Sequence, residues 1–206
     1  MGGALSTEDL QKVTKHTNFS FEEVEEKYKD FIAKYPNGKV NKDQFQQVYC
    51  EMFANAWGKS GISRGDSWWR HVFRACDKDG SGSVDFKELI MALDMSLSGT
   101  PEQKLAWMFR IYDINRCGTV NERDLTAVVT ALHESEINKH RGRKRVQHEK
   151  EIVKKCHKLF EKLDKNRDQK VDQEEFVQLC MEDDELYQFL VNYQTQLGDE
   201  NEISAD

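Results

Sequence analysis

The amino-acid sequence predicts an all-α protein built from four helix–loop–helix repeats. A valine recurs at the centre of four short polar segments, and these valines are Val40, Val84, Val120 and Val171. A glycine stands two residues before each of the first three valines, and an apolar residue that opens a new helical pattern stands five residues after all four. Recurrence of one such unit along a chain is typical of a repeat architecture.

The composition suits a soluble helical protein. Hydrophobic residues make up 38% of the 206 residues and charged residues 33%. The formal net charge of −7 disfavours nucleic acid as a partner and favours cations. The five cysteines form no C-x-x-C pair, so we expect neither a zinc site nor a disulfide framework. The sequence shows no apolar run of transmembrane length and no signal peptide, so we expect a cytoplasmic protein.

The second segment, from Asp77 to Glu88, has oxygen-bearing residues at the spacing of a twelve-residue EF-hand calcium loop. Ca²⁺ is a hard ion that takes about six to eight oxygen ligands. The predicted ligands are Asp77, Asp79, Ser81, Ser83 through its backbone carbonyl, and Glu88 through both carboxylate oxygens. Asp85 is expected to act through a water, and Gly82 permits the positive φ of the sharp bend.

The fourth segment, from Asp164 to Glu175, repeats this arrangement with one departure. Its predicted ligands are Asp164, Asn166, Asp168, Lys170 through its carbonyl, and Glu175. Gln169 stands where glycine is usual, and a non-glycine residue there costs about 1 kcal/mol in backbone strain. We therefore expect calcium binding with reduced affinity.

The third segment is a weaker candidate for calcium. Its predicted ligands are Asp113, Asn115, Cys117, Thr119 and Asp124. Neutral sulfur at Cys117 is a poor ligand for a hard cation, and the side chain of Asp124 is shorter than that of the usual glutamate. This loop is expected to bind Ca²⁺ weakly, to tolerate six-coordinate Mg²⁺, or to serve only as a structural loop held by its partner. A redox role for the Cys117 thiol stays open.

The first segment is predicted to bind no metal. Ala33, Lys34 and Tyr35 stand where the first ligands belong, Pro36 stiffens the loop, and Gln44 closes it. We expect this loop to pair with another loop.

Six short strings carry a resemblance to a known family. They are Tyr35-Pro36-Asn37-Gly38, His71-Val-Phe-Arg-Ala-Cys-Asp77, Val84-Asp-Phe86 with Glu88-Leu-Ile, Glu102-Gln-Lys-Leu105-Ala-Trp107, and Tyr112-Asp113. Together they make residues 21 to 190 resemble the neuronal calcium sensor family, the recoverin, neurocalcin and guanylate-cyclase-activating group. The resemblance implies four EF-hand motifs in two tandem paired lobes, with short β contacts between paired loops through their central valines.

The expected domains follow from this organisation. They are an N-terminal arm at 1–20, a first lobe at 21–98, a second lobe at 99–190 with a basic insert near 134–150, and an acidic tail at 191–206. Gly99 and Thr100-Pro101 suit the junction between the lobes, because glycine ends one helix and Thr-Pro begins the next.

The amino terminus indicates a membrane link. Met1-Gly2-Gly-Ala-Leu-Ser6 matches the N-myristoylation signal, and the resemblance implies myristate on Gly2. One acyl chain gives only marginal membrane affinity, so stable attachment needs a second signal. The alternative is a disordered start that leads into an N-terminal helix.

The function predicted from these features is that of a calcium sensor that regulates an unidentified target protein. Such a sensor exposes an apolar groove when its helices reorient, and our candidates for this groove are Trp57, Trp68 and Met91. The alternatives are a calcium buffer and a constitutive regulatory subunit of an enzyme or channel. No catalytic constellation is present in the sequence, so we do not expect an enzyme.

Overall fold

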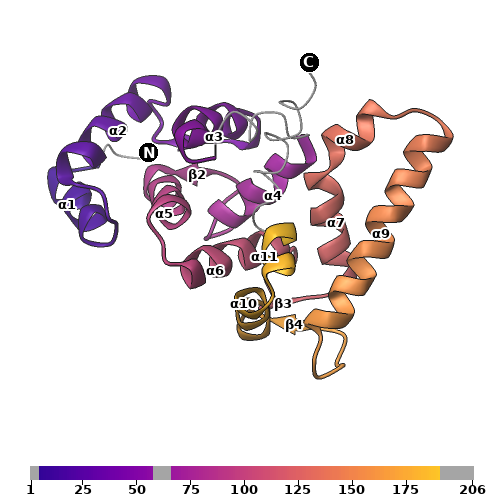
Figure 1. Cartoon of the computed structure of the whole chain (residues 1–206). Coiled ribbons are helices and arrows are strands. Elements are labelled where there is room, and N and C mark those ends of the chain that lie inside the picture. The colour runs from indigo at the N-terminus through magenta and orange to yellow at the C-terminus, as the bar shows by residue number, and fades with distance from the viewer. Residues whose placement is uncertain (1–4, 58–65, 191–206) are drawn as a thin grey trace, which may run out of the picture.

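The computed structural model of the chain describes residues 5–57 and 66–190, except the side chains of 49, 50, 52–57, 66, 185 and 188. The first half contains α1 (Thr7–Lys15), α2 (Phe21–Lys34), β1 (Lys39–Val40), α3 (Lys42–Trp57), α4 (Asp66–Cys76), β2 (Val84–Asp85) and α5 (Phe86–Leu97). The second half contains α6 (Pro101–Tyr112), β3 (Thr119–Val120), α7 (Glu122–Leu132), α8 (Glu134–Lys139), α9 (Arg143–Leu163), β4 (Val171–Asp172), α10 (Gln173–Glu182) and α11 (Asp184–Leu190). Figure 1 shows the four predicted helix–loop–helix repeats in this order.

The helices that leave the loops begin at capping boxes written in the sequence. The Asp85 carboxylate accepts a hydrogen bond from the Glu88 amide, and the Glu88 carboxylate accepts one from the Asp85 amide, which starts α5. Helix α6, which enters the third loop, starts in the same way at Thr100 and Gln103, with Pro101 at the first helical position. These reciprocal bonds satisfy amides that would otherwise lack partners at each helix start.

The loops pair through their central valines, as the sequence predicts. Val40 lies opposite Val84 in the antiparallel pair β1–β2, and Val120 lies opposite Val171 in the pair β3–β4. All four valines are buried. The first loop is therefore joined to the second and the third to the fourth, which is the arrangement of two paired lobes.

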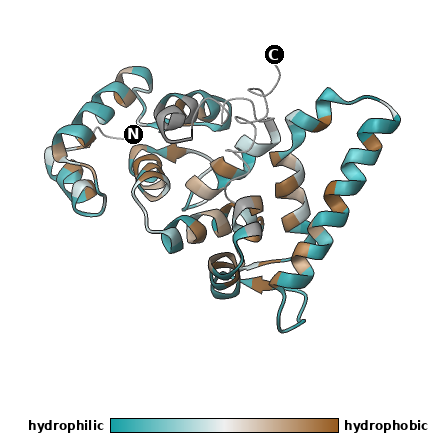
Figure 2. Ribbon diagram, in the orientation of Figure 1, coloured by the Kyte–Doolittle hydropathy of each residue, from teal (hydrophilic) through white to brown (hydrophobic). Residues whose placement is uncertain are grey.

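Aromatic side chains pack beneath each pair of loops. In the first lobe, the Phe86 ring lies 5.0 Å from Tyr28 and 5.5 Å from Phe31, centroid to centroid. In the second lobe, the Phe176 ring lies 5.6 Å from Phe109 and 5.8 Å from Tyr112. These distances fall in the favourable range for tilted and edge-on aromatic pairs. Hydrophobic residues gather on the helix faces turned toward neighbouring helices (Figure 2).

The N-terminal helix packs on the first lobe. Helix α1 lies beside α2 (Figure 1), with the side chains of Leu10 and Val13 buried. Asn18 donates from its backbone and side-chain nitrogens to the buried carboxylate of Asp94 in α5, the backbone bond being 2.8 Å long. The described chain thus begins attached to the first lobe rather than separate from it.

The insert between the third and fourth loops forms α8 and the outer turns of α9. Residues 138 to 147, which include the basic run, are exposed. The outer length of α9 is mainly hydrophilic (Figure 2), although Val146 and Val153 are each 49% exposed. Across the described part of the chain, no helix combines the length and the apolar character that crossing a membrane requires.

Helix α4 lies at the centre of the molecule (Figure 1). It contacts α3 and α5 of its own lobe, and α6 and α7 of the other lobe. The second and third loops, which follow α4 and α6, therefore face each other across the junction between the lobes.

Candidate metal centre

The first ligand position of the second loop is held by backbone amides. The carboxylate of Asp77, which directly follows α4, accepts hydrogen bonds from the Ser81 amide at 2.9 Å and the Gly82 amide at 3.1 Å. Gly82 adopts a φ of +77°, the conformation that a residue without a Cβ takes at little cost. Asp77 itself is buried, so these bonds fix the direction of its oxygens.

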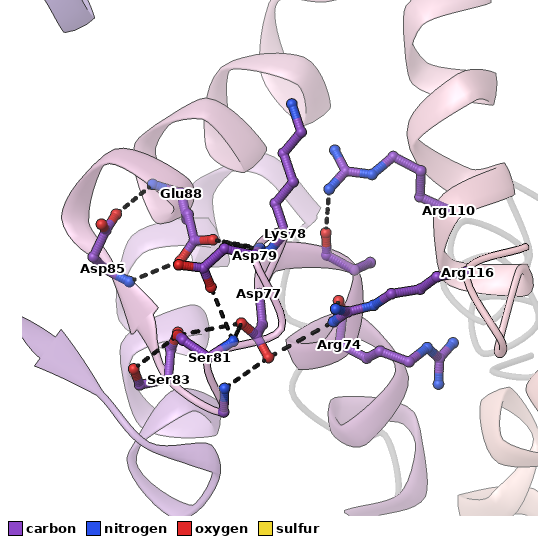
Figure 3. Close-up of polar contacts among 12 residues, drawn as sticks. Arg74, Asp77, Lys78, Asp79, Ser81, Ser83, Asp85, Glu88, Arg110 and Arg116 are labelled. Atoms are coloured by element: carbon purple, nitrogen blue, oxygen red, sulfur yellow. Dashed lines mark hydrogen bonds and ion pairs between the residues drawn. The ribbon is translucent and has the colours of Figure 1, made fainter. Parts of the chain in front are cut away.

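The last ligand position of this loop faces back toward the first (Figure 3). Glu88 Oε1 accepts from the Lys78 amide at 2.8 Å, and Oε2 accepts from the Asp85 amide at 3.1 Å. Partial burial raises the pKa of Glu88 above its ordinary value. Both oxygens of Glu88 therefore lie within the loop, where a bidentate ligand belongs.

The oxygens of the second loop converge on one place. Carboxylate oxygens of Asp77, Asp79 and Glu88 all lie within 4.8 Å of one another. The Ser81 hydroxyl lies 2.8 Å from the Ser83 carbonyl, which brings the two remaining predicted ligands to the same side of the loop. Five oxygen-bearing groups without sulfur or imidazole suit a hard cation, so these residues fit Ca²⁺.

The fourth loop has the same backbone hydrogen bonds to its first ligand as the second loop, but its acidic side-chain oxygens are less closely grouped. Asp164 accepts hydrogen bonds from the amides of Asp168 at 3.1 Å and Gln169 at 3.0 Å. Asp168 Oδ1 accepts from the Lys170 amide, and Glu175 Oε2 accepts from the Asp172 amide. Within residues 5–57 and 66–190, three acidic ligand atoms lie within 4.8 Å of one another in the second loop alone.

Gln169 takes the left-handed backbone conformation that the sequence assigns to this position. Its φ is +66°, close to the +77° of Gly82 and the +80° of Gly118 in the other two loops. The fourth loop thus keeps the geometry of its siblings with a side chain that disfavours it.

The third loop brings its predicted ligands together with weaker chemistry. Asp113 accepts from the amides of Cys117 and Gly118, and the Asn115 amide nitrogen lies 3.5 Å from Asp124 Oδ1. Cys117 Sγ lies 3.3 Å from the Thr119 carbonyl, in the place that Ser81 Oγ occupies in the second loop. Burial raises the pKa of Asp124.

The first loop closes without a carboxylate at its last ligand position. The Gln44 side-chain oxygen accepts from the Asn41 amide at 3.0 Å, and Asn41 in turn caps the Gln44 amide. Gly38 makes the turn with a φ of +70° and donates to the Tyr35 carbonyl. A neutral amide therefore stands where Glu88 stands in the second loop.

The predicted target-surface residues differ in position. Trp68, in α4, is fully buried, whereas Met91, on α5, is 43% exposed. The side chain of Trp57 and the whole of Gly2 lie outside the described residues.

Three arginines beside the second loop were not singled out from the sequence. Arg74, Arg110 and Arg116 reach across the junction between the lobes (Figure 3). A signal for two of them exists, because Arg74 and Arg110 each stand three residues before the first ligand of a loop, Asp77 or Asp113. Only the fold reveals that these equivalent positions face each other.

Comparison with known proteins agrees with this site. A family model described as an EF-hand domain pair matches residues 102–181, and one described as an EF-hand domain matches residues 68–98. S-modulin of Aquarana catesbeiana is 32% identical over 194 residues, which are 94% of this chain and 92% of S-modulin. The chain belongs to the neuronal calcium sensor family.

Two further relatives of this calcium sensor cover it almost completely. Recoverin of Homo sapiens is 30% identical over 188 residues, 91% of this chain and 90% of recoverin. Visinin of Gallus gallus is 30% identical over 191 residues, 93% of this chain and 95% of visinin. The predictions of an EF-hand fold, of calcium as the ligand and of a calcium sensor that regulates a target protein are confirmed.

Proposed function

We propose that this calcium sensor binds Ca²⁺ at the second and fourth loops, and more weakly at the third. The observation that carries this assignment is the convergence of Asp77, Asp79 and Glu88 within 4.8 Å. Bound Ca²⁺ supplies two positive charges that balance the clustered carboxylates. The predicted ligands of the fourth loop are all oxygen atoms, which supports calcium binding there. In the third loop, Cys117 and Asp124 lower the affinity for calcium.

Glu88 links calcium binding to the orientation of α5 relative to α4. This residue belongs to the first turn of α5, whereas Asp77 follows the last turn of α4. Ligation by both ends of the loop fixes α5 relative to α4, and the two helices pack on each other in the first lobe. Calcium shifts the population toward the helix arrangement that binds it more tightly.

The target surface is proposed to lie on the first lobe. Met91 is already exposed on α5, whereas Trp68 reaches a partner only after α4 moves. A cavity of about 450 Å³ between α2 and α3 combines Phe31, Tyr35 and Val48 with charged side chains, so it suits an amphipathic partner segment rather than a purely apolar one. The charged residues are Lys27, Asp30, Lys34 and Glu51. The partner is an unidentified protein.

Membrane association is proposed through myristate on Gly2. The first described residue, Leu5, donates its amide to the Tyr28 hydroxyl at 2.6 Å, so the chain reaches the first lobe within the acylation signal, three residues after Gly2. Peripheral attachment of this kind needs a second signal besides the acyl chain.

The test is a calcium titration, with magnesium present, followed by the fluorescence of an apolar dye and of the native tryptophans. We expect dye binding to rise with calcium and the rise to disappear in the double variant Glu88→Gln, Glu175→Gln. Calcium uptake without any spectral change contradicts the switch and favours a buffer or a constitutive subunit. Recovery of the sensor with its target in the presence of chelator favours the constitutive subunit.

A further inference from the structure

The entering helices of the second and third loops are joined by two equivalent hydrogen bonds. Arg74 of α4 donates to the Ile111 carbonyl of α6 at 2.7 Å, and Arg110 of α6 donates to the Ala75 carbonyl of α4 at 2.6 Å. Each arginine stands three residues before the first ligand of its own loop, and each carbonyl stands two residues before the first ligand of the other. The two loops are therefore tied together at corresponding points, one in each lobe.

A third arginine extends this contact into the metal site. Arg116, from the third loop, donates to the Arg74 carbonyl at 2.7 Å, and its guanidinium lies 3.7 Å from Asp77 Oδ2 (Figure 3). A Cβ added to Gly80 would lie 3.0 Å from Arg116 Nη1, so the guanidinium rests directly on the backbone of the second loop. Arg116 thus places a fixed positive charge beside the first ligand of the neighbouring loop.

We propose that Arg116, a residue of the third loop, lowers the calcium affinity of the second loop, whose Asp77 its guanidinium contacts. This proposal rests on the proposed function, because it takes the Asp77–Glu88 loop as a calcium site. The guanidinium competes with a cation for the carboxylate of Asp77 and repels any divalent charge held there. Since Asp77 is 7% exposed at its side chain, water screens this interaction incompletely.

The same contact couples the two lobes. Arg116 bridges the end of α4 and the third loop through the Arg74 carbonyl. Neutralisation of Asp77 by a bound cation removes the attraction that holds the guanidinium on the second loop, so occupation of this loop loosens the tie to the third. By thermodynamic linkage, a ligand that holds Arg116 in the third loop changes the calcium affinity of the second loop by some factor. Calcium bound in the second loop changes the affinity for that ligand by the same factor.

The test compares calcium affinities of the full-length chain by isothermal titration calorimetry. The parent protein carries Asp124→Asn and Glu175→Gln, which disable the third and fourth loops and leave the second as the measured site. Arg116→Gln in this parent removes the charge but keeps a donor for the Arg74 carbonyl. We expect it to lower the Kd of the second loop about threefold to tenfold at low ionic strength, with a smaller difference at about 0.3 M salt.

The control is Arg167→Gln. Arg167 holds the same fourth position in its loop and nearly the same φ, +59° against +54° for Arg116, so the backbone effect of the two substitutions is matched. Among the ion pairs of the described residues, none joins Arg167 to another loop. We expect Arg167→Gln to leave the Kd of the second loop unchanged and Arg116→Lys to retain most of the parent value.

The outcomes separate the two proposals. A parent that binds no calcium at the second loop refutes the proposed function and this inference together. A parent that binds, with an unchanged or raised Kd in Arg116→Gln, refutes the role of Arg116 alone. Arg116→Ala provides a second neutral variant, and circular dichroism checks that each variant is folded before its Kd is compared.

Discussion

The positive φ of Gln169 predicts how much the substitution Gln169→Gly changes the free energy of unfolding. A non-glycine residue in the left-handed region costs about 1–2 kcal/mol, and glycine at the same place costs about 0.5–1 kcal/mol in chain entropy. Gln169 is exposed, so its side chain adds little packing. The substitution Gln169→Gly is therefore expected to raise the free energy of unfolding by about 0.5–1 kcal/mol.

The assay is urea denaturation in the presence of chelator, with the change in midpoint converted through a common slope. Gln169→Ala serves as the control, because alanine keeps the Cβ that causes the strain and is expected to give no gain. Unchanged or reduced stability of Gln169→Gly would show that the backbone is not strained here.

Three further predictions concern the core, the pH response and the thiols. Phe86→Ala is expected to lower the free energy of unfolding by about 3–5 kcal/mol in chemical denaturation, because the ring is buried against two other aromatic rings. Burial lowers the pKa of His133 to about 4, so the unfolded chain takes up the proton first, and this histidine is expected to lower stability by about 2 kcal/mol between pH 7 and pH 5. Burial lowers the pKa of His71 to about 4 as well, so His133→Gln should remove about half of the combined slope and leave the part due to His71. A thiol reagent is expected to modify exposed Cys117 faster than buried Cys76, whose pKa is raised by burial, and calcium should slow the reaction only if the third loop binds it.

The loops and their pairing were predictable because their information is local. Each loop carries its ligands and its bend within twelve consecutive residues, and the valine at the centre marks the strand. The contacts Val40–Val84 and Val120–Val171 then follow from the family resemblance. The ligand assignments themselves stay predictions that the calcium titrations will test.

Contacts between distant segments were not predictable from the sequence. The bond from Asn18 to Asp94 spans 76 residues, and nothing near either residue identifies the other as its partner. The contact between Arg116 and Asp77 also depends on how the two lobes meet, a geometry that repeat spacing does not specify. Sequence patterns specify the units here, and side-chain packing specifies how the units are joined.

The pairing of Val40 with Val84 has a consequence for the shape of the calcium response. It joins a loop that lacks carboxylates at the predicted ligand positions to the loop at Asp77–Glu88, so the first lobe takes up a single ion under our assignment. A single site passes from one-tenth to nine-tenths occupied over an about 80-fold rise in free calcium. The second lobe, with two candidate loops joined through Val120 and Val171, has the means to respond more steeply, so one chain combines a graded reading of calcium with a sharper one.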